Sequence, residues 1–210
     1  PDGSLDANFD GDGRLITDFA GYNDKVNALA LQPDGKLIAA GSTNYNYYMD
    51  FALARYNPDG SLDASFDGDG RLTTDFDTDL DFAQALAMQP DGKIIAAGTE
   101  GTYGISDFAL ARYNPDGSLD TSFDGDGRLA TRFPNGFSDG HALALQPDGK
   151  IIAAGVADNG SDDDFALARY IAGGGGGHFA YNPDGQFEWL AEGEVATDTF
   201  TYVVSDGVLT

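Results

Sequence analysis

The sequence predicts an all-β fold made of tandem four-stranded β units that resemble the blades of a propeller. Three observations predict it: a repeat of fixed length, four strand-like runs in each repeat, and a composition rich in turn-forming residues. The chain has 210 residues with 29 glycines, and its 35 acidic residues divide into 31 Asp and 4 Glu. Because Asp and Gly favour turns whereas Glu favours helices, we expect short strands joined by many turns.

The repeat appears as motifs that recur at one fixed distance. Asp-Phe-Ala-Leu-Ala-Arg-Tyr begins at positions 50, 107 and 164, and Gln-Pro-Asp-Gly-Lys begins at positions 32, 89 and 146. Three repeats of equal length, 1–57, 58–114 and 115–171, therefore fill the chain up to residue 171 without insertion or deletion. Such regularity predicts three equivalent structural units.

Each repeat contains four runs with the composition of strands. In the second repeat these runs are Arg71–Phe76, Gln84–Gln89, Lys93–Gly98 and Phe108–Asn114. Pro-Asp-Gly between the middle two runs presets a tight turn and predicts a hairpin over 85–98. The runs are apolar on both faces, so we expect each sheet to be covered by neighbouring sheets. These features favour propeller blades, with a β-solenoid or an open stack as the alternative.

Three units make a small number for a closed propeller, which typically has four to eight blades. The edges of the array are therefore expected to pair with further repeats. A longer array, an oligomeric ring or filament, and an open stack all fit this expectation.

Three motifs follow one another along the chain. They are Asp-Phe-Ala-Leu-Ala-Arg-Tyr-Asn-Pro-Asp-Gly-Ser-Leu-Asp, Ser-Phe-Asp-Gly-Asp-Gly-Arg-Leu and Ala-Leu-Gln-Pro-Asp-Gly-Lys-Ile-Ile-Ala-Ala-Gly. Over residues 1–170 they resemble the delta-60 repeat family of bacterial secreted and surface proteins. The resemblance implies a propeller-like β fold, a secreted or cell-surface location, and no known catalytic residues.

The remaining residues differ from the repeats. Residues 172–177 are rich in glycine and are expected to form a linker. Residues 178–210 contain Phe-Ala-Tyr-Asn-Pro-Asp-Gly-Gln-Phe at 179–187 and Ala-Thr-Asp-Thr-Phe-Thr-Tyr-Val-Val-Ser-Asp-Gly at 196–207, and they resemble the closing strands of a VCBS-type, cadherin-like adhesin repeat. Residues 199, 201 and 203 alternate with 200, 202 and 204, which predicts a half-buried strand. This partial, β-sandwich-like tail is too short to bury a core of its own.

Charge and cysteine content exclude several classes of function. The net charge of -24 disfavours binding to nucleic acid or to anionic lipid, and favours cations as partners. The absence of cysteine excludes disulfides, thiolate catalysis and Cys-ligated metal centres. No apolar run approaches the roughly 20 residues that span a bilayer, so we expect no membrane span.

An acidic loop that recurs in each repeat is the best candidate for a metal site. In its first copy, oxygen ligands stand at alternate positions before Gly11, as in the first half of a calcium loop, but the Glu that closes an EF-hand is missing. The alternative is that these side chains make hydrogen bonds to turn backbone. The candidate calcium ligands are Asp6, Asn8, Asp10, Asp12, Asp63, Asp67, Asp69, Asp120, Asp124 and Asp126.

Three further groups of residues attract attention. The acids at 75, 77, 79 and 81 are expected to lie in a solvated loop, because they would repel one another on a strand. The arginines at 55, 112 and 169 are expected to pair with neighbouring aspartates. Tyr45, Tyr47 and Tyr48 form an aromatic loop suited to contacts with sugars or proteins.

We predict no catalytic residues. The only histidines are His141 and His178, and no Ser–His–Asp order or His-rich metal spacing is present. With 31 Asp in the chain, a carboxylate pair at almost any spacing carries no information. The sequence thus favours a non-catalytic extracellular structural protein for adhesion or for matrix or filament assembly, stiffened by calcium. It would bind other copies of the same repeat, a glycan or a surface protein; a carbohydrate-binding β-propeller module is the alternative.

Overall fold

Three antiparallel sheets and no helix make up the described part of the computed structural model, residues 2–19, 23–45, 48–102 and 104–171. The chain divides into two units, Pro1–Gly174 and Gly175–Thr210. The second unit, which holds the whole VCBS-like segment 178–210, and the linker 172–177 lie outside the described residues. Within the described ranges no helix has the length and apolar character needed to cross a membrane.

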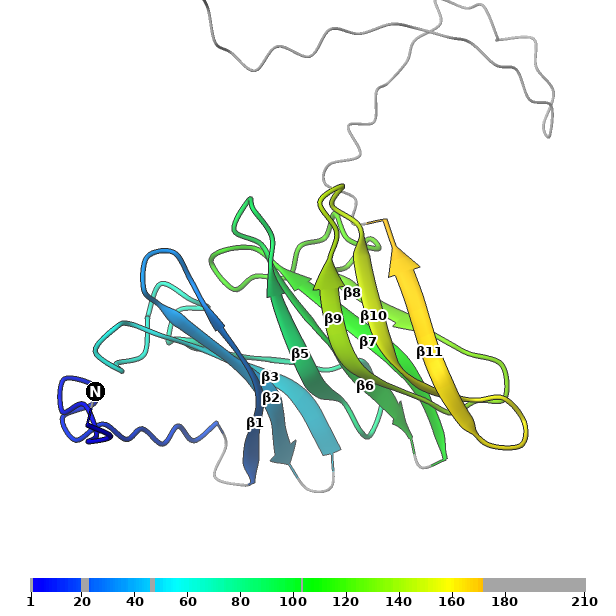
Figure 1. Cartoon of the computed structure of the whole chain (residues 1–210), viewed down its shortest axis with the longest axis horizontal. Helices are drawn as coiled ribbons and strands as arrows, with labels where there is room; N and C mark the ends of the chain where they lie inside the picture. Colours follow the sequence, from blue (N-terminus) through cyan, green and yellow to red (C-terminus); the bar gives the residue numbers. More distant parts are fainter. Residues whose placement is uncertain (1, 20–22, 46–47, 103, 172–210) are drawn as a thin grey trace, which may run out of the picture. The chain divides into compact units, whose positions relative to one another are not determined.

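The strands follow the chain order within each sheet, as Figure 1 shows. The first sheet contains β1 (Asp24–Leu31), β2 (Leu37–Tyr45), β3 (Tyr48–Tyr56) and β4 (Arg71–Thr74). The second contains β5 (Phe82–Met88), β6 (Ile94–Thr102), β7 (Ile105–Tyr113) and β8 (Arg128–Thr131). The third contains β9 (Ser138–Leu145), β10 (Ile151–Asp158) and β11 (Asp163–Tyr170). The predicted all-β fold of four-stranded, propeller-like units is confirmed.

The Pro-Asp-Gly turns join the first two strands of each sheet, as predicted. Between β5 and β6 the backbone N–H of Gln89 donates to the carbonyl oxygen of Lys93 at 2.8 Å. Gly92 adopts a φ of 85°, which a residue with a Cβ rarely tolerates. The turn sequence therefore fixes the hairpin and its register.

Each sheet is offset from the sequence repeat. The run at 71–74 pairs with β3 of the preceding repeat, with Leu53 opposite Leu72, whereas β5–β7 form the next sheet. The loop before β4 returns along β3: the N–H of Asp63 donates to the carbonyl of Arg55, and the N–H of Arg55 donates to the carbonyl of Gly70, both at 2.9 Å. Every complete sheet therefore ties two consecutive repeats together.

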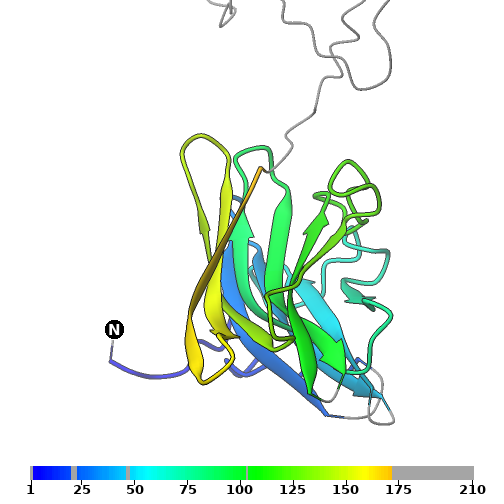
Figure 2. The same cartoon turned by 90° about the vertical axis from the view of Figure 1, so that its right-hand side faces the viewer.

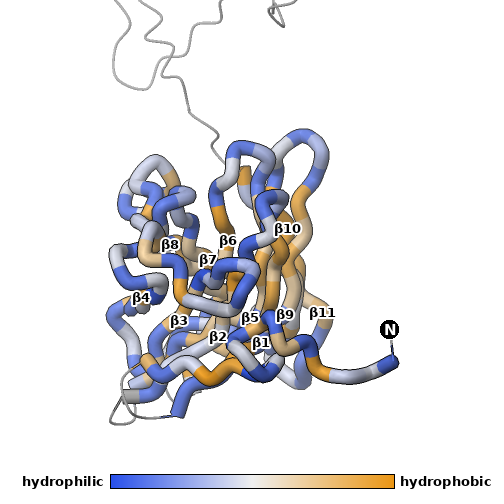
Figure 3. Tube along the Cα trace, turned by 90° about the vertical axis from the view of Figure 1, so that its left-hand side faces the viewer, coloured by the Kyte–Doolittle hydropathy of each residue, from blue (hydrophilic) through white to orange (hydrophobic). Residues whose placement is uncertain are grey.

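The hydrophobic cores lie between adjacent sheets, which pack face to face in Figure 2 and carry their apolar residues on the strands in Figure 3. The first sheet contributes Ile38, Ala40, Phe51 and Leu53 to one core, and the second contributes Ala83, Ile94, Ala96, Ala109, Ala111 and Tyr113. The second and third sheets share an equivalent core. Strands β3 and β7 are buried on both faces over their last six residues, as expected for covered sheets. The same expectation is wrong for β1 and β11, which keep most of their residues exposed or half-buried.

Candidate functional site

A buried ionic cluster joins each complete sheet to the acidic loop that precedes its outer strand. Asp63 Oδ2 lies 2.7 Å from Nε of Arg55, on β3, and 2.8 Å from Nζ of Lys36, in the β1–β2 turn. Arg55 also donates to Ser65 Oγ at 2.9 Å, and its guanidinium carbon lies 4.7 Å from the centre of the Phe66 ring. We call this arrangement the Arg–Asp–Lys cluster.

The second sheet has the same cluster one repeat further along the chain. Asp120 Oδ2 lies 2.7 Å from Nε of Arg112 and 2.6 Å from Nζ of Lys93. Burial opposes ionisation of Asp120, but the hydrogen bonds from Lys93 and Ser122 outweigh it and hold the pKa of the carboxyl well below its usual range. The predicted pairing of arginine with a neighbouring aspartate is thus confirmed for Arg55 and Arg112.

Elsewhere in the described residues, the two cations of this cluster and its acidic loop occur separately, at opposite ends of the array of sheets. On the third sheet Arg169 has no carboxylate partner among the described ion pairs, and Lys150 contacts only Asp148 of its own turn. At the other end, the first acidic loop has an exposed Asp6, whose Oδ1 accepts hydrogen bonds from Asn8. Its counterparts Asp63 and Asp120 are only 6% and 5% exposed.

The geometry of the acidic loops bears on the calcium prediction without testing it. In all three loops the first Asp accepts hydrogen bonds from the backbone N–H two residues later, the turn geometry considered as the alternative. Asp12, Asp69 and Asp126 accept from the N–H groups of the following arginines in the same way. Asp10, Asp67 and Asp124 sit at a φ of 50°. Calcium uptake by these loops remains a prediction.

A different group of acids is brought together between the first and second sheets. Carboxylate oxygens of Asp50, on β3, and of Asp75 and Asp81, on either side of the β4–β5 loop, all lie within 4.8 Å of one another. Asp81 is fully buried, so the expectation that the acids at 75–81 lie in a solvated loop is wrong for this residue. It accepts hydrogen bonds from the N–H of Phe76 at 2.8 Å and from the hydroxyl of Thr78. Those local donors hold it inside the loop.

Comparison of the repeats could have indicated this acid cluster. The equivalent positions in the next repeat carry Asp107, Arg132 and Ser138, so one carboxylate is replaced by a cation and another by a neutral hydroxyl. The change of residue type between these two repeats, rather than any shared motif, indicates where carboxylates gather.

The acid cluster makes stability depend on pH. Burial is the main cause that raises the pKa of Asp81 to about 6, and the charges of Asp75 and Glu100 add to it. The folded state thus binds this proton more tightly than the unfolded state. We expect the free energy of unfolding to fall as the pH rises from about 4 to about 7, by up to about 3 kcal/mol from this group.

Urea unfolding of Asp81→Asn across that range tests the prediction. The variant is expected to be more stable than the parent at neutral pH and to lose less stability between about pH 4 and pH 7 than the parent does. Asp77→Asn, in the same loop but 84% exposed, is the matched control and should keep the slope of the parent. An unchanged slope in Asp81→Asn would contradict the assignment.

The other predicted residues are only partly described. Tyr45 and Tyr48 close the β2–β3 hairpin as register partners, and Tyr48 is 54% exposed. Tyr47 and His178 lie outside the described residues. His141 Nε2 lies 3.7 Å from Asp139 Oδ2 on a partly exposed strand. Sugar binding by the tyrosine loop remains a prediction.

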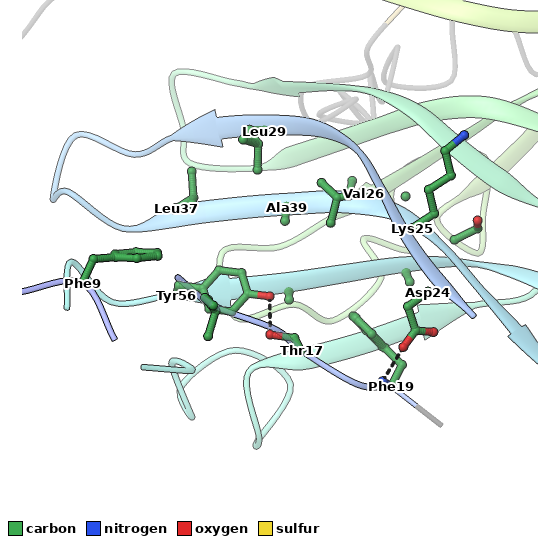
Figure 4. Close-up of a pocket in the computed structure, with 16 residues that line it drawn as sticks. Phe9, Thr17, Phe19, Asp24, Lys25, Val26, Leu29, Leu37, Ala39 and Tyr56 are labelled. Atoms are coloured by element: carbon green, nitrogen blue, oxygen red, sulfur yellow. Dashed lines mark hydrogen bonds between the residues drawn. The ribbon is translucent and has the colours of Figure 1, made fainter. Parts of the chain in front are cut away.

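The outer face of the first sheet is apolar and hollow. A pocket of about 260 Å³ lies between this sheet and the segment 2–19. Figure 4 shows Phe9, Thr17 and Phe19 of that segment across from side chains of β1 and β2. We call the lining residues Leu15, Phe19, Val26, Leu29, Leu37 and Tyr56 the head surface.

The third sheet also leaves apolar residues uncovered. Phe165 and Leu167 on β11 are 96% and 65% exposed, although their counterparts Phe51, Leu53, Phe108 and Leu110 are all 0% exposed. We call the residues Ile152, Ala154, Phe165 and Leu167 the tail surface. The heptapeptide is the same in the three strands, so the difference arises from neighbours and not from local sequence.

Three segments of the chain match a β-propeller family. They are residues 32–66, 89–123 and 146–174, and the family is described as a domain of unknown function (DUF5122) β-propeller. Residues 13–46 match the WD domain, G-beta repeat. These matches agree with a tandem-repeat propeller fold, whereas the finer resemblances to delta-60 and VCBS repeats stay predictions. No curated protein sequence matches the chain.

Among solved structures the chain resembles virginiamycin B lyase from Staphylococcus aureus. The TM-score is 0.39 and the sequence identity 13%, over 69% of this chain. The match spans only 40% of the length of the lyase.

Proposed function

We propose that this chain is a non-catalytic, extracellular structural repeat protein that works through association of its β units, in adhesion or in assembly of a matrix or filament. One observation carries the proposal: the outer faces of the first and third sheets expose apolar side chains of the kind that form the cores between the sheets. Exposed apolar patches of this sort mark interaction sites on soluble proteins. The secreted or cell-surface location rests on the family resemblance alone.

The polar groups support a structural role as well. The buried charges, Arg55 with Asp63 and Arg112 with Asp120, neutralise each other and tie loops to sheets. Structural ion-pair networks commonly contain charges paired in this way, so a structural role accounts for these groups. The proposal extends to calcium, since a net charge of -24 favours a cation at the acidic loops.

Light scattering with and without millimolar calcium tests the proposal. We expect the purified chain to give a mass above its 22.0 kDa, increasing with protein concentration. Calcium at the acidic loops should give a calorimetric heat of binding and a higher melting temperature. A chain that is monomeric under both conditions would overturn the associative function, and the lack of both calcium effects would overturn its calcium component.

A further inference from the structure

We propose that the partner of this chain is a second copy of itself, docked head to tail, with residues 14–17 of one copy pairing with the free edge of β11 in the other. The inference rests on the associative function proposed above and specifies its partner and geometry. Within the described residues, the outer faces of the first and third sheets lack contacts that the sheets make with one another inside the chain.

The strand pairing inside the chain defines the register. Phe51, Leu53 and Ala54 of β3 lie opposite Thr74, Leu72 and Arg71 of β4. The pair β7–β8 has this same register in the next repeat. Strand β11 carries the same residues at 165–168, yet within the described residues its sheet has three strands and lacks a counterpart of β4. Residues 14–17, the counterpart of β4 and β8, form no strand in the described structure.

The segment 2–19 already makes two of the contacts that its counterparts make later in the chain. Tyr56 donates from its hydroxyl to Thr17 Oγ1 at 2.8 Å, just as the Tyr113 and Thr74 hydroxyls lie 2.8 Å apart. The N–H of Asp10 donates to the carbonyl of Asp59 at 2.7 Å, matching the bond from Asp67 to Asp116. The segment is therefore placed as the outer strand of a preceding sheet, which a second copy can supply.

The head surface is equivalent to one half of the core between the first two sheets, without the sheet that covers it there. One repeat later in the chain, its residues correspond to Leu72, Phe76, Ala83, Leu86, Ile94 and Tyr113, which belong to the core between the first two sheets or pack against it. From β2 and β3 of the preceding sheet, that core also contains Ile38, Ala40, Phe51 and Leu53. The tail surface presents the same four residue types at 152, 154, 165 and 167. Tail surface and pocket are thus complementary.

The charges at the two ends are complementary as well. In the pose defined by the internal register, Asp6 of the second copy meets Arg169 and Lys150, as Asp63 meets Arg55 and Lys36. Phe9 takes the place of Phe66 under the guanidinium. One new Arg–Asp–Lys cluster would form at each junction, and it would order a strand edge that is otherwise exposed.

The number of sheets in a dimer matches the number of blades in closed propellers. Two copies bring six sheets together, within the usual range of four to eight blades. A head-to-tail contact repeated by rotation gives a ring when the rotation closes.

Point variants and mass measurements test the inference. Phe165→Ser, at 96% exposure, should leave the fold intact by circular dichroism and weaken association by about tenfold or more. Leu29→Ser on the head surface should act in the same way. Ile16→Ser is the matched control: the side chain is 95% exposed, and its counterparts Thr73 and Ala130 stay exposed inside the chain.

Cysteine pairs give a second, independent measurement, because the chain has no cysteine of its own. The register places residue 16 of one copy opposite residue 166 of the other, as Thr73 lies opposite Ala52. Partners in an antiparallel pair are close enough for a disulfide. The double variant Ile16→Cys/Ala166→Cys should form covalent oligomers on mild oxidation, and Ile16→Cys/Ala168→Cys should form far fewer.

The outcomes separate the inference from the function on which it rests. Association that survives Phe165→Ser and Leu29→Ser, with equal cross-linking by both cysteine pairs, would overturn the head-to-tail contact and leave the associative function standing. A strictly monomeric parent chain would overturn both.

Discussion

Replacement of Phe108 by alanine is expected to lower the free energy of unfolding by about 3–5 kcal/mol. The side chain is fully buried between the second and third sheets, and its ring centre lies 4.9 Å from that of Phe133. Truncation removes an aromatic contact and leaves a cavity that rigid sheets on either side fill poorly. Urea unfolding followed by fluorescence or circular dichroism measures the change.

The matched control for this prediction is Phe165→Ala. Phe165 stands at the equivalent position of an identical heptapeptide but is 96% exposed. Measured on the monomer, its truncation is expected to change the free energy of unfolding by no more than about 0.5 kcal/mol. Equal losses in the two variants would contradict the prediction. They would show that other residues of the same chain cover Phe165 in solution, although this side chain is exposed in the structure.

The comparison of these two phenylalanines also shows what a local sequence can and cannot predict. The period, the hairpin turns and the position of the strands were all predictable, because Pro-Asp-Gly geometry and apolar runs act within a few residues. Burial of one face of a strand depends instead on which sheet lies against it. Identical residues at 108 and 165 therefore have opposite environments.

The pairing of β4 with β3 and the burial of Asp81 have the same non-local origin. The sequence of the run Arg71–Phe76 does not indicate which strand it pairs with. The preceding loop returns along Arg55 through two backbone hydrogen bonds, and this places β4 beside β3. Asp81 stands in an acidic stretch whose composition is typical of a solvated loop. Hydrogen bonds from the N–H of Phe76 and the hydroxyl of Thr78 hold its carboxylate in a buried position.

Replacement of Arg112 by methionine is expected to cost about 3–5 kcal/mol of the free energy of unfolding, because it removes one of the two cations that pair with the buried Asp120. The Arg112 side chain is 1% exposed and that of Asp120 is 7% exposed. Arg169→Met is the matched control and should cost little in the monomer, since the third sheet lacks a described acidic loop. A comparable loss in both variants would contradict this account of the cluster.

The pH dependence of this variant separates lost charge pairing from lost packing. In the parent the pKa of Asp120 is held below its ordinary value, so the ion pair stabilises the fold above about pH 4 and less as the pH falls. The cost of Arg112→Met should therefore shrink as the pH falls below about 4, because Asp120 takes up its proton in the unfolded chain and in the variant before it does so in the folded parent. A packing defect would cost the same at every pH. Arg112→Lys should recover only part of the loss: a lysine cannot donate to Asp120 and Ser122 from one planar group while stacking on Phe123.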